Sequence, residues 1–92
     1  MSKSEEHTYE FLFLKIVQGG EVIKIALTDE NLSKKFREMY IPILKELDLK
    51  PKDIFFSNVE GKMLLNHDLE KDLRTIIVRF GNNLRLYSEK IF

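Results

Sequence analysis

Histidines and carboxylates that lie close together in the sequence are the first candidates for chemistry. The chain contains two histidines, His7 and His67, and the second is followed by Asp68, Glu70 and Asp72. A metal site needs ligands that converge from paired spacings, and one His-Asp neighbour pair does not supply them. Carboxylates at the start of a helix interact favourably with the positive end of its dipole. We therefore expect surface or capping roles for these residues and no metal site.

The other catalytic patterns are incomplete. The sequence contains no cysteine, which excludes disulfides, thiolate metal sites and a cysteine nucleophile. Ser57 and Ser88 have no candidate base in their neighbourhood. The Gly19-Gly20 pair lacks the lysine and the helix that follow a phosphate-binding loop. These observations predict a chain that is not an enzyme and holds no cofactor.

Composition narrows the partners. The 92 residues suffice for one domain, and 15 basic residues balance 15 acidic ones. Zero net charge argues against nucleic-acid binding, although lysines and arginines near aromatic residues leave a local basic patch open. The apolar runs are far shorter than the roughly 20 residues that cross a membrane. We expect a flexible tail over residues 1–8, one domain over residues 9–92, and a cytoplasmic location.

The elements that must position any site follow from periodicity. Tyr9–Val17 and Glu21–Leu27 are β-rich and flank Gln18-Gly19-Gly20, which predicts a hairpin. Apolar residues at helical spacing then predict a long helix up to about Leu49, with a bend or a short break near Tyr40–Ile41 caused by Pro42. The apolar stripe of this helix comprises Leu32, Phe36, Met39, Tyr40, Ile43, Leu44 and Leu47.

The second half of the chain predicts shorter elements. Ile54–Ser57 and Lys62–Leu65 are expected as short strands around a turn. A helix follows from Asp68, its expected N-cap, to Gly81, and a strand through residues 75–80 is the alternative because four of those six residues are β-branched. The last strand is predicted over residues 84–87.

Three stretches carry a resemblance to a known family. They are Leu49-Lys50-Pro51-Lys52-Asp53-Ile54-Phe55-Phe56 with Gly61-Lys62-Met63-Leu64, and Arg79-Phe80-Gly81-Asn82-Asn83-Leu84-Arg85-Leu86. With the element order, they resemble the ubiquitin-like β-grasp family, and most of all its ubiquitin-fold modifiers. The resemblance covers about residues 9 to 90. It implies an α+β fold of ββαββαβ order, with a mixed sheet packed on one main helix, and partner binding through one face of the sheet.

The C-terminal residues depart from this family. Ubiquitin-like modifiers are joined to their targets through a C-terminal glycine, whereas this chain ends in Ile91-Phe92 and has no glycine after Gly81. The departure argues against conjugation of the chain as it stands and against a sulfur-carrier role. Conjugation after C-terminal processing stays open as an alternative, although cleavage back to Gly81 would delete the last strand.

Alternation along the strands predicts which side chains point away from the helix. The side of the first two strands that carries Lys15 and Lys24 is expected to face solvent, with lysines at its rim. Five residues then form an outward patch of the types that binding hot spots favour: Phe11, Phe13, Phe55, Arg85 and Tyr87. Partner binding, association of two copies, and burial of the patch by Phe92 or the bent helix are the three interpretations.

Two functional hypotheses follow. The first is a non-catalytic ubiquitin-like protein that binds other proteins through this aromatic face. The second is an accessory subunit of a larger enzyme or of a secretion assembly.

Overall fold

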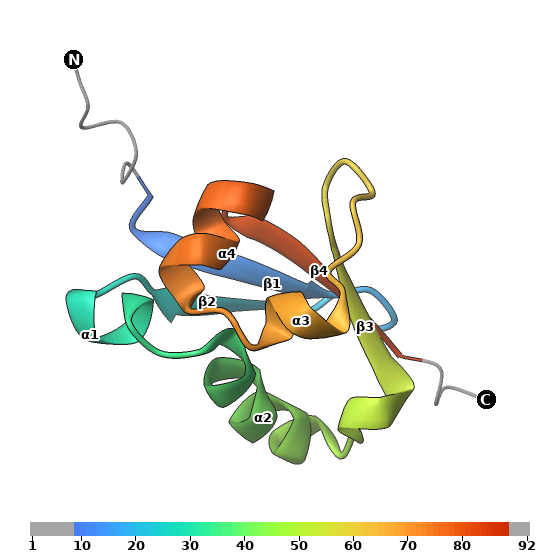
Figure 1. The fold of residues 1–92 in the computed structure, drawn as a ribbon. Helices are drawn as coiled ribbons and strands as arrows, with labels where there is room; N and C mark the ends of the chain where they lie inside the picture. The colour runs from blue at the N-terminus through green and yellow to red at the C-terminus, as the bar shows by residue number, and fades with distance from the viewer. Residues whose placement is uncertain (1–8, 89–92) are drawn as a thin grey trace.

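A four-stranded mixed sheet forms the centre of the chain. The computed structural model describes residues 9–88, so the predicted tail and Phe92 lie outside the described residues. The strand order is β2-β1-β4-β3, in which β1 and β4 are parallel and both outer pairs are antiparallel (Figure 1). The strands are β1 (Phe11–Ile16), β2 (Val22–Ala26), β3 (Ile54–Asn58) and β4 (Asn83–Ser88).

The hairpin between β1 and β2 confirms the strongest local prediction. Gly20 has φ +78°, a backbone conformation that residues with a side chain rarely adopt. Its amide donates a 2.8 Å hydrogen bond to the Ile16 carbonyl, which closes the turn. The register pairs Leu14 with Ile23 and Leu12 with Ile25, so the aliphatic residues of both strands share one face.

The helical segment after β2 differs from the prediction. It consists of α1 (Asp29–Leu32) and α2 (Phe36–Leu47), with a break at residues 33–35 and no interruption at Pro42. Pro42 lies on the exposed side of α2, where the carbonyl that loses its helical donor faces water. The short break predicted near Tyr40–Ile41 is therefore absent, and the chain breaks instead at residues 33–35, directly before α2.

The break at residues 33–35 has a tertiary cause. A matching linker lies at residues 70–72, between α3 (Asn66–Leu69) and α4 (Leu73–Phe80). The two linkers pair through an antiparallel bridge between Lys35 and Asp72, and the Phe36 and Leu73 amides donate 2.8 Å hydrogen bonds to opposite linkers. The segments α1–α2 and α3–α4 thus share one arrangement, a short helix, a linker and a longer helix. Each linker accepts a backbone hydrogen bond from the first residue of the helix that follows the other linker.

Residues 75–80 form a helix, as predicted, but its N-cap is a different aspartate. Asp72 Oδ1 accepts a 2.8 Å hydrogen bond from the Thr75 amide at the start of α4. Asp68 instead lies in α3, where its Oδ2 accepts from the Leu65 amide at 2.8 Å. The prediction of Asp68 as the N-cap of this helix is wrong, because a separate short helix, α3, begins before Asp68.

The predicted strand at Lys62–Leu65 is reduced to one bridge. Asn58 Oδ1 accepts hydrogen bonds from the Glu60 and Lys62 amides at 2.9 Å, which forms the expected turn. Only Met63 then pairs with β3, opposite Ser57, before the chain enters α3. Lys50-Pro51 leads into a short 3-10 helix, η2 (Pro51–Asp53).

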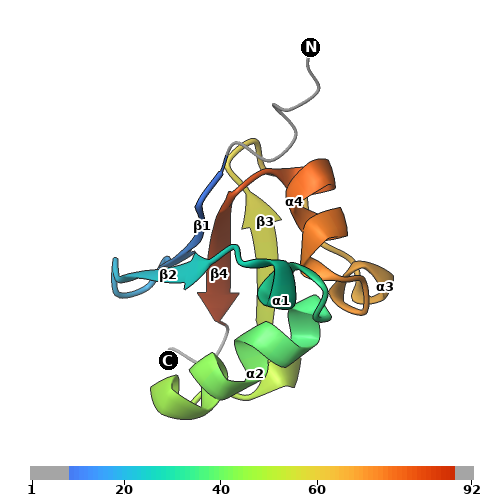
Figure 2. The same ribbon diagram turned by 90° about the vertical axis from the view of Figure 1, so that its left-hand side faces the viewer.

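Two helices, rather than one main helix, cover the inner face of the sheet (Figure 2). The rings of Phe36 and Tyr40 from α2 pack against Phe56 of β3, with centroids 4.9–5.1 Å apart. The fully or nearly buried core also includes residues of β1, α4 and β4: Leu12, Leu14, Leu73, Ile76, Ile77, Leu84 and Leu86. The protein is therefore an α+β domain with a mixed sheet whose helices lie on one side.

Candidate functional site

The face of the sheet opposite the helices, here called the open face, carries all five predicted site residues. Phe11 and Phe13 project from β1, Phe55 from β3, and Arg85 and Tyr87 from β4, each on the side of its strand opposite the buried core residues. Phe55 is 36% exposed and the other four are half-buried. Neither α1 nor α2 covers them, so the bent helix does not bury this face.

The aromatic residues of the open face form two groups. The rings of Phe55 and Tyr87, opposite each other in register, stack with centroids 4.9 Å apart and planes 8° apart. The rings of Phe11 and Phe13 lie 6.2 Å apart. Phe13 is in register with Asn83, four residues before Tyr87, so the two groups are separated by about 13 Å along the strands. The five predicted residues therefore share a face but do not form one cluster.

A row of cations separates the aromatic groups. Lys15 of β1 is in register with Arg85 of β4, and the row continues to Val22 on β2 and Ser57 on β3. Lys15 therefore lies in a central strand and not at the rim, where the sequence analysis placed it. Lys24 is on the edge strand β2, with its Nζ 4.8 Å from the centre of the Phe11 ring.

The open face carries no opposing charge of its own. Its outward strand positions include three cations, Lys15, Lys24 and Arg85, and no aspartate or glutamate. Within residues 9–88, none of these cations forms an ion pair. The face is thus locally basic although the whole chain is neutral.

A hollow of about 340 Å³ lies on the open face beside this row. Phe13, Val22 and Val59 contribute apolar walls, and Lys15 and Arg85 flank it. A second hollow, of about 330 Å³, lies between α1 and α4 and contains both Asp29 and Arg74. Of these two hollows, the one on the open face combines an apolar lining with charge of a single sign.

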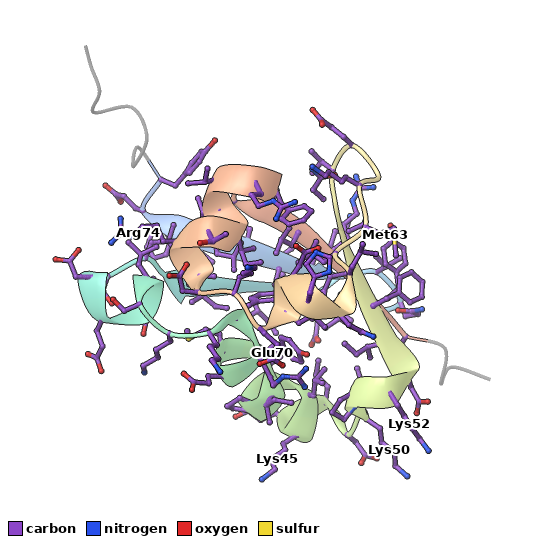
Figure 3. The ribbon with its side chains drawn as sticks, viewed as in Figure 1. Lys45, Lys50, Lys52, Met63, Glu70 and Arg74 are labelled. Carbon is purple, nitrogen blue, oxygen red and sulfur yellow. The ribbon has the colours of Figure 1, made fainter. Side chains whose placement is uncertain are left out.

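Two exposed residues extend the apolar surface beyond the predicted patch. Met63 is 42% exposed and lies opposite Ser57, which places it on the open-face side of β3 (Figure 3). Val59 is 55% exposed and lines the hollow. Sequence reasoning missed both: Met63 lies in the predicted strand Lys62–Leu65, whose outward side was not assigned, and Val59 lies in the turn after β3, where strand alternation does not apply.

Hydrogen bonds lower the pKa of the Tyr87 hydroxyl. Ser57 Oγ lies 3.4 Å from the Tyr87 hydroxyl, and Arg85 also contacts it. These two hydrogen bonds, that of Ser57 first, hold the pKa of Tyr87 below its ordinary value. Arg85 is thereby directed along the open face toward a neutral partner.

The histidine and carboxylates singled out first have separate structural contacts. Asp68 is buried, with Oδ1 3.5 Å from both His67 Nε2 and Arg79 Nη1. Glu70 forms ion pairs with Lys35 and Arg37. Hydrogen bonds from Thr75 lower the pKa of Asp72, which keeps this cap ionised at neutral pH. The three carboxylates thus contact different partners, His67 lies against one of them, and His7 lies outside the described residues.

Comparisons with known proteins give no relative. No protein-family model matches the chain, and a search of curated proteins finds no match. Among residues 9–88, no group of three potential metal ligands comes together, and no helix has the length and apolar character needed to cross a membrane. The function must therefore be argued from the site itself.

Proposed function

We propose that this chain is a non-catalytic, ubiquitin-like β-grasp protein that binds other proteins through the open face. The observation that carries the proposal is the aromatic and cationic surface on β1, β3 and β4, which no helix covers. Hot spots of protein interfaces are enriched in tyrosine, tryptophan and arginine, and two of the five residues are of these types. Exposed apolar patches rimmed by polar residues are typical of interaction sites.

The β-grasp assignment rests on sequence and topology together. The sequence stretches around Ile54–Phe56 and Gly61–Leu64 resemble the ubiquitin-like family. A parallel central pair, β1 and β4, between two antiparallel outer strands supports the same assignment. The absence of cysteine remains the basis for expecting a cytoplasmic location.

Conjugation after processing is a weaker alternative for a structural reason. Cleavage at Gly81 would remove β4, which pairs with both β1 and β3. The remaining strands would lose the partner that joins them, together with the buried Leu84 and Leu86. The accessory-subunit hypothesis uses the same open face and differs in having one stoichiometric partner.

The test is capture of partners on the immobilised chain, followed by reconstitution with each purified partner. We expect Phe55→Ala and Tyr87→Ala to abolish binding with the fold preserved. The matched control is Val78→Ala, because Val78 is 70% exposed on α4, away from the open face. Binding that persists in both aromatic variants would contradict the proposal.

The same captures separate the alternatives. One partner that co-purifies at a fixed ratio would identify an accessory subunit, whereas several reversible partners would identify an interaction module. A parallel capture under denaturing conditions retains only covalent adducts, so an adduct there would identify a conjugated form. Light scattering of the purified chain measures association of two copies.

A further inference from the structure

We propose that the open face recognises an acidic segment of a partner protein, with a carboxylate between Lys15 and Arg85 and an apolar side chain in the hollow beside Phe13. This inference rests on the proposed function and names the chemistry of the partner. It follows from the arrangement of charge on the face, which differs from the rest of the described chain.

The first argument is the pairing of like charges. Lys15 and Arg85 occupy registered positions on the two central strands, where cross-strand neighbours interact directly. Like charges in such positions destabilise a sheet, and a carboxylate there would remove the repulsion. The open face has no carboxylate at its outward strand positions. An acidic partner would therefore be attracted by the positive potential of Lys15 and Arg85, which no carboxylate at these strand positions neutralises.

The second argument is the chemistry that surrounds the two cations. Arginine presents a planar fork of donors that suits both oxygens of a carboxylate. The hollow flanked by Arg85 and Lys15 has walls from Phe13, Val22 and Val59, which suit an aliphatic or aromatic side chain. A segment with a carboxylate next to an apolar anchor would fill both features at once.

Two other occupants fit the face less well. A second copy docked face to face about a two-fold axis would bring Lys15, Lys24 and Arg85 toward the same cations of its partner. A single-stranded nucleic acid needs free ring faces for its bases. Phe55 and Tyr87 stack on each other, and Lys24 lies over the Phe11 ring, so much of the aromatic surface is already used.

The test selects short peptides from a random library on the immobilised full chain. We expect the selected peptides to be enriched in Asp and Glu next to an apolar residue. Their affinity should fall at least about 10-fold in the double variant Lys15→Glu/Arg85→Glu. It should also fall as ionic strength rises from about 50 to about 300 mM.

Two sets of variants control the test. The double variant Lys45→Glu/Lys50→Glu makes the same change of charge at the end of α2 and beyond it, away from the sheet (Figure 3), and should bind as the unchanged chain does. Lys15→Gln and Arg85→Gln remove one charge each without adding a carboxylate, and circular dichroism checks that every variant is folded. The single variants Lys15→Gln and Arg85→Gln should weaken binding less than the double variant Lys15→Glu/Arg85→Glu.

Each other outcome overturns a defined part of the proposal. Selected peptides without acidic enrichment, which still lose affinity in Phe55→Ala or Phe13→Ala, would overturn the acidic partner and leave the docking face. Peptides that ignore every open-face variant, or no selected peptides, would overturn both. A thymidine oligonucleotide that binds the chain more tightly than the selected peptides would overturn the acidic partner in favour of a nucleic acid.

Discussion

The two faces of the sheet differ in how their charges are paired and how far their aromatic rings are buried. On the helical side, Glu70 pairs with Lys35 and Arg37, and the rings of Phe36 and Tyr40 are fully enclosed. On the open face, Lys15 and Arg85 share a row without a carboxylate, and Phe55 remains exposed. The ion pairs found within residues 9–88 all belong to the helical layer.

This difference separates the parts of the molecule that maintain the fold from those available for binding. A side chain that is buried and paired contributes to folding, so its loss reduces the free energy of unfolding. A side chain that is exposed and has no charged partner contributes little to folding and is available for binding. Matched substitutions on the two faces can therefore test whether folding depends on the helical side and binding on the open face.

The largest difference is expected between neighbouring residues of β4. Leu86 is fully buried, so Leu86→Ala should lower the free energy of unfolding by about 2–5 kcal/mol through lost contacts and a residual cavity. Tyr87→Ala, one residue further on the opposite face, should lose the stack with Phe55, about 0.5–1.5 kcal/mol, and the hydrogen bond from Ser57 Oγ, but should leave no enclosed cavity. Urea denaturation measures both. Equal losses would show that the open face is part of the core.

A smaller difference, of opposite sign, is expected for charges. Glu70→Gln removes one partner from the pairs with Lys35 and Arg37 and should destabilise the fold by up to about 1 kcal/mol. Arg85→Gln relieves repulsion with Lys15 and should stabilise it by a few tenths, about 0.2–0.5 kcal/mol. Thermal melting at low and high salt checks both signs, and salt should shrink both effects. A destabilised Arg85→Gln would contradict the expected sign and show that the contact of Arg85 with the Tyr87 hydroxyl outweighs its repulsion with Lys15.

The smallest expected effect is on tyrosine ionisation. Burial, opposed in part by Arg37, raises the pKa of Tyr40, whereas the hydrogen bonds of Ser57 and Arg85 lower the pKa of Tyr87. Ultraviolet titration should show Tyr87 ionising before Tyr40, with Tyr40→Phe and Tyr87→Phe identifying the contributions of these two of the three tyrosines. Ser57→Ala should return the Tyr87 pKa toward its ordinary value of about 10. An unchanged Tyr87 step in that variant would contradict the hydrogen bond.

Tyrosine ionisation also predicts how stability changes at high pH. The pKa of Tyr40 is higher in the folded chain than in the unfolded one, so the folded state holds its proton longer. Its contribution is fully present below a pH of about 10 and is lost as the pH rises through the folded value. Tyr40→Phe should remove this loss, which denaturation at increasing pH can measure.

Local patterns in the sequence were sufficient for much of the fold and for the direction of the site residues. The glycine pair predicted the hairpin, and alternation along β1 and β4 predicted that Phe11, Phe13 and Tyr87 turn away from the helices. These features depend on residues that are near each other in the chain, because the side-chain period of a strand is set by its own backbone. The binding role of these residues stays a prediction.

Contacts between distant segments decided the rest. The helix breaks at residues 33–35 because that linker pairs with residues 70–72, and Asp72 rather than Asp68 caps α4 for the same reason. Lys15 and Arg85 become neighbours only because β1 and β4 pair in parallel. Periodicity places a side chain on a face, whereas the register between strands chooses its neighbours, and the charge of the candidate site depends on that register.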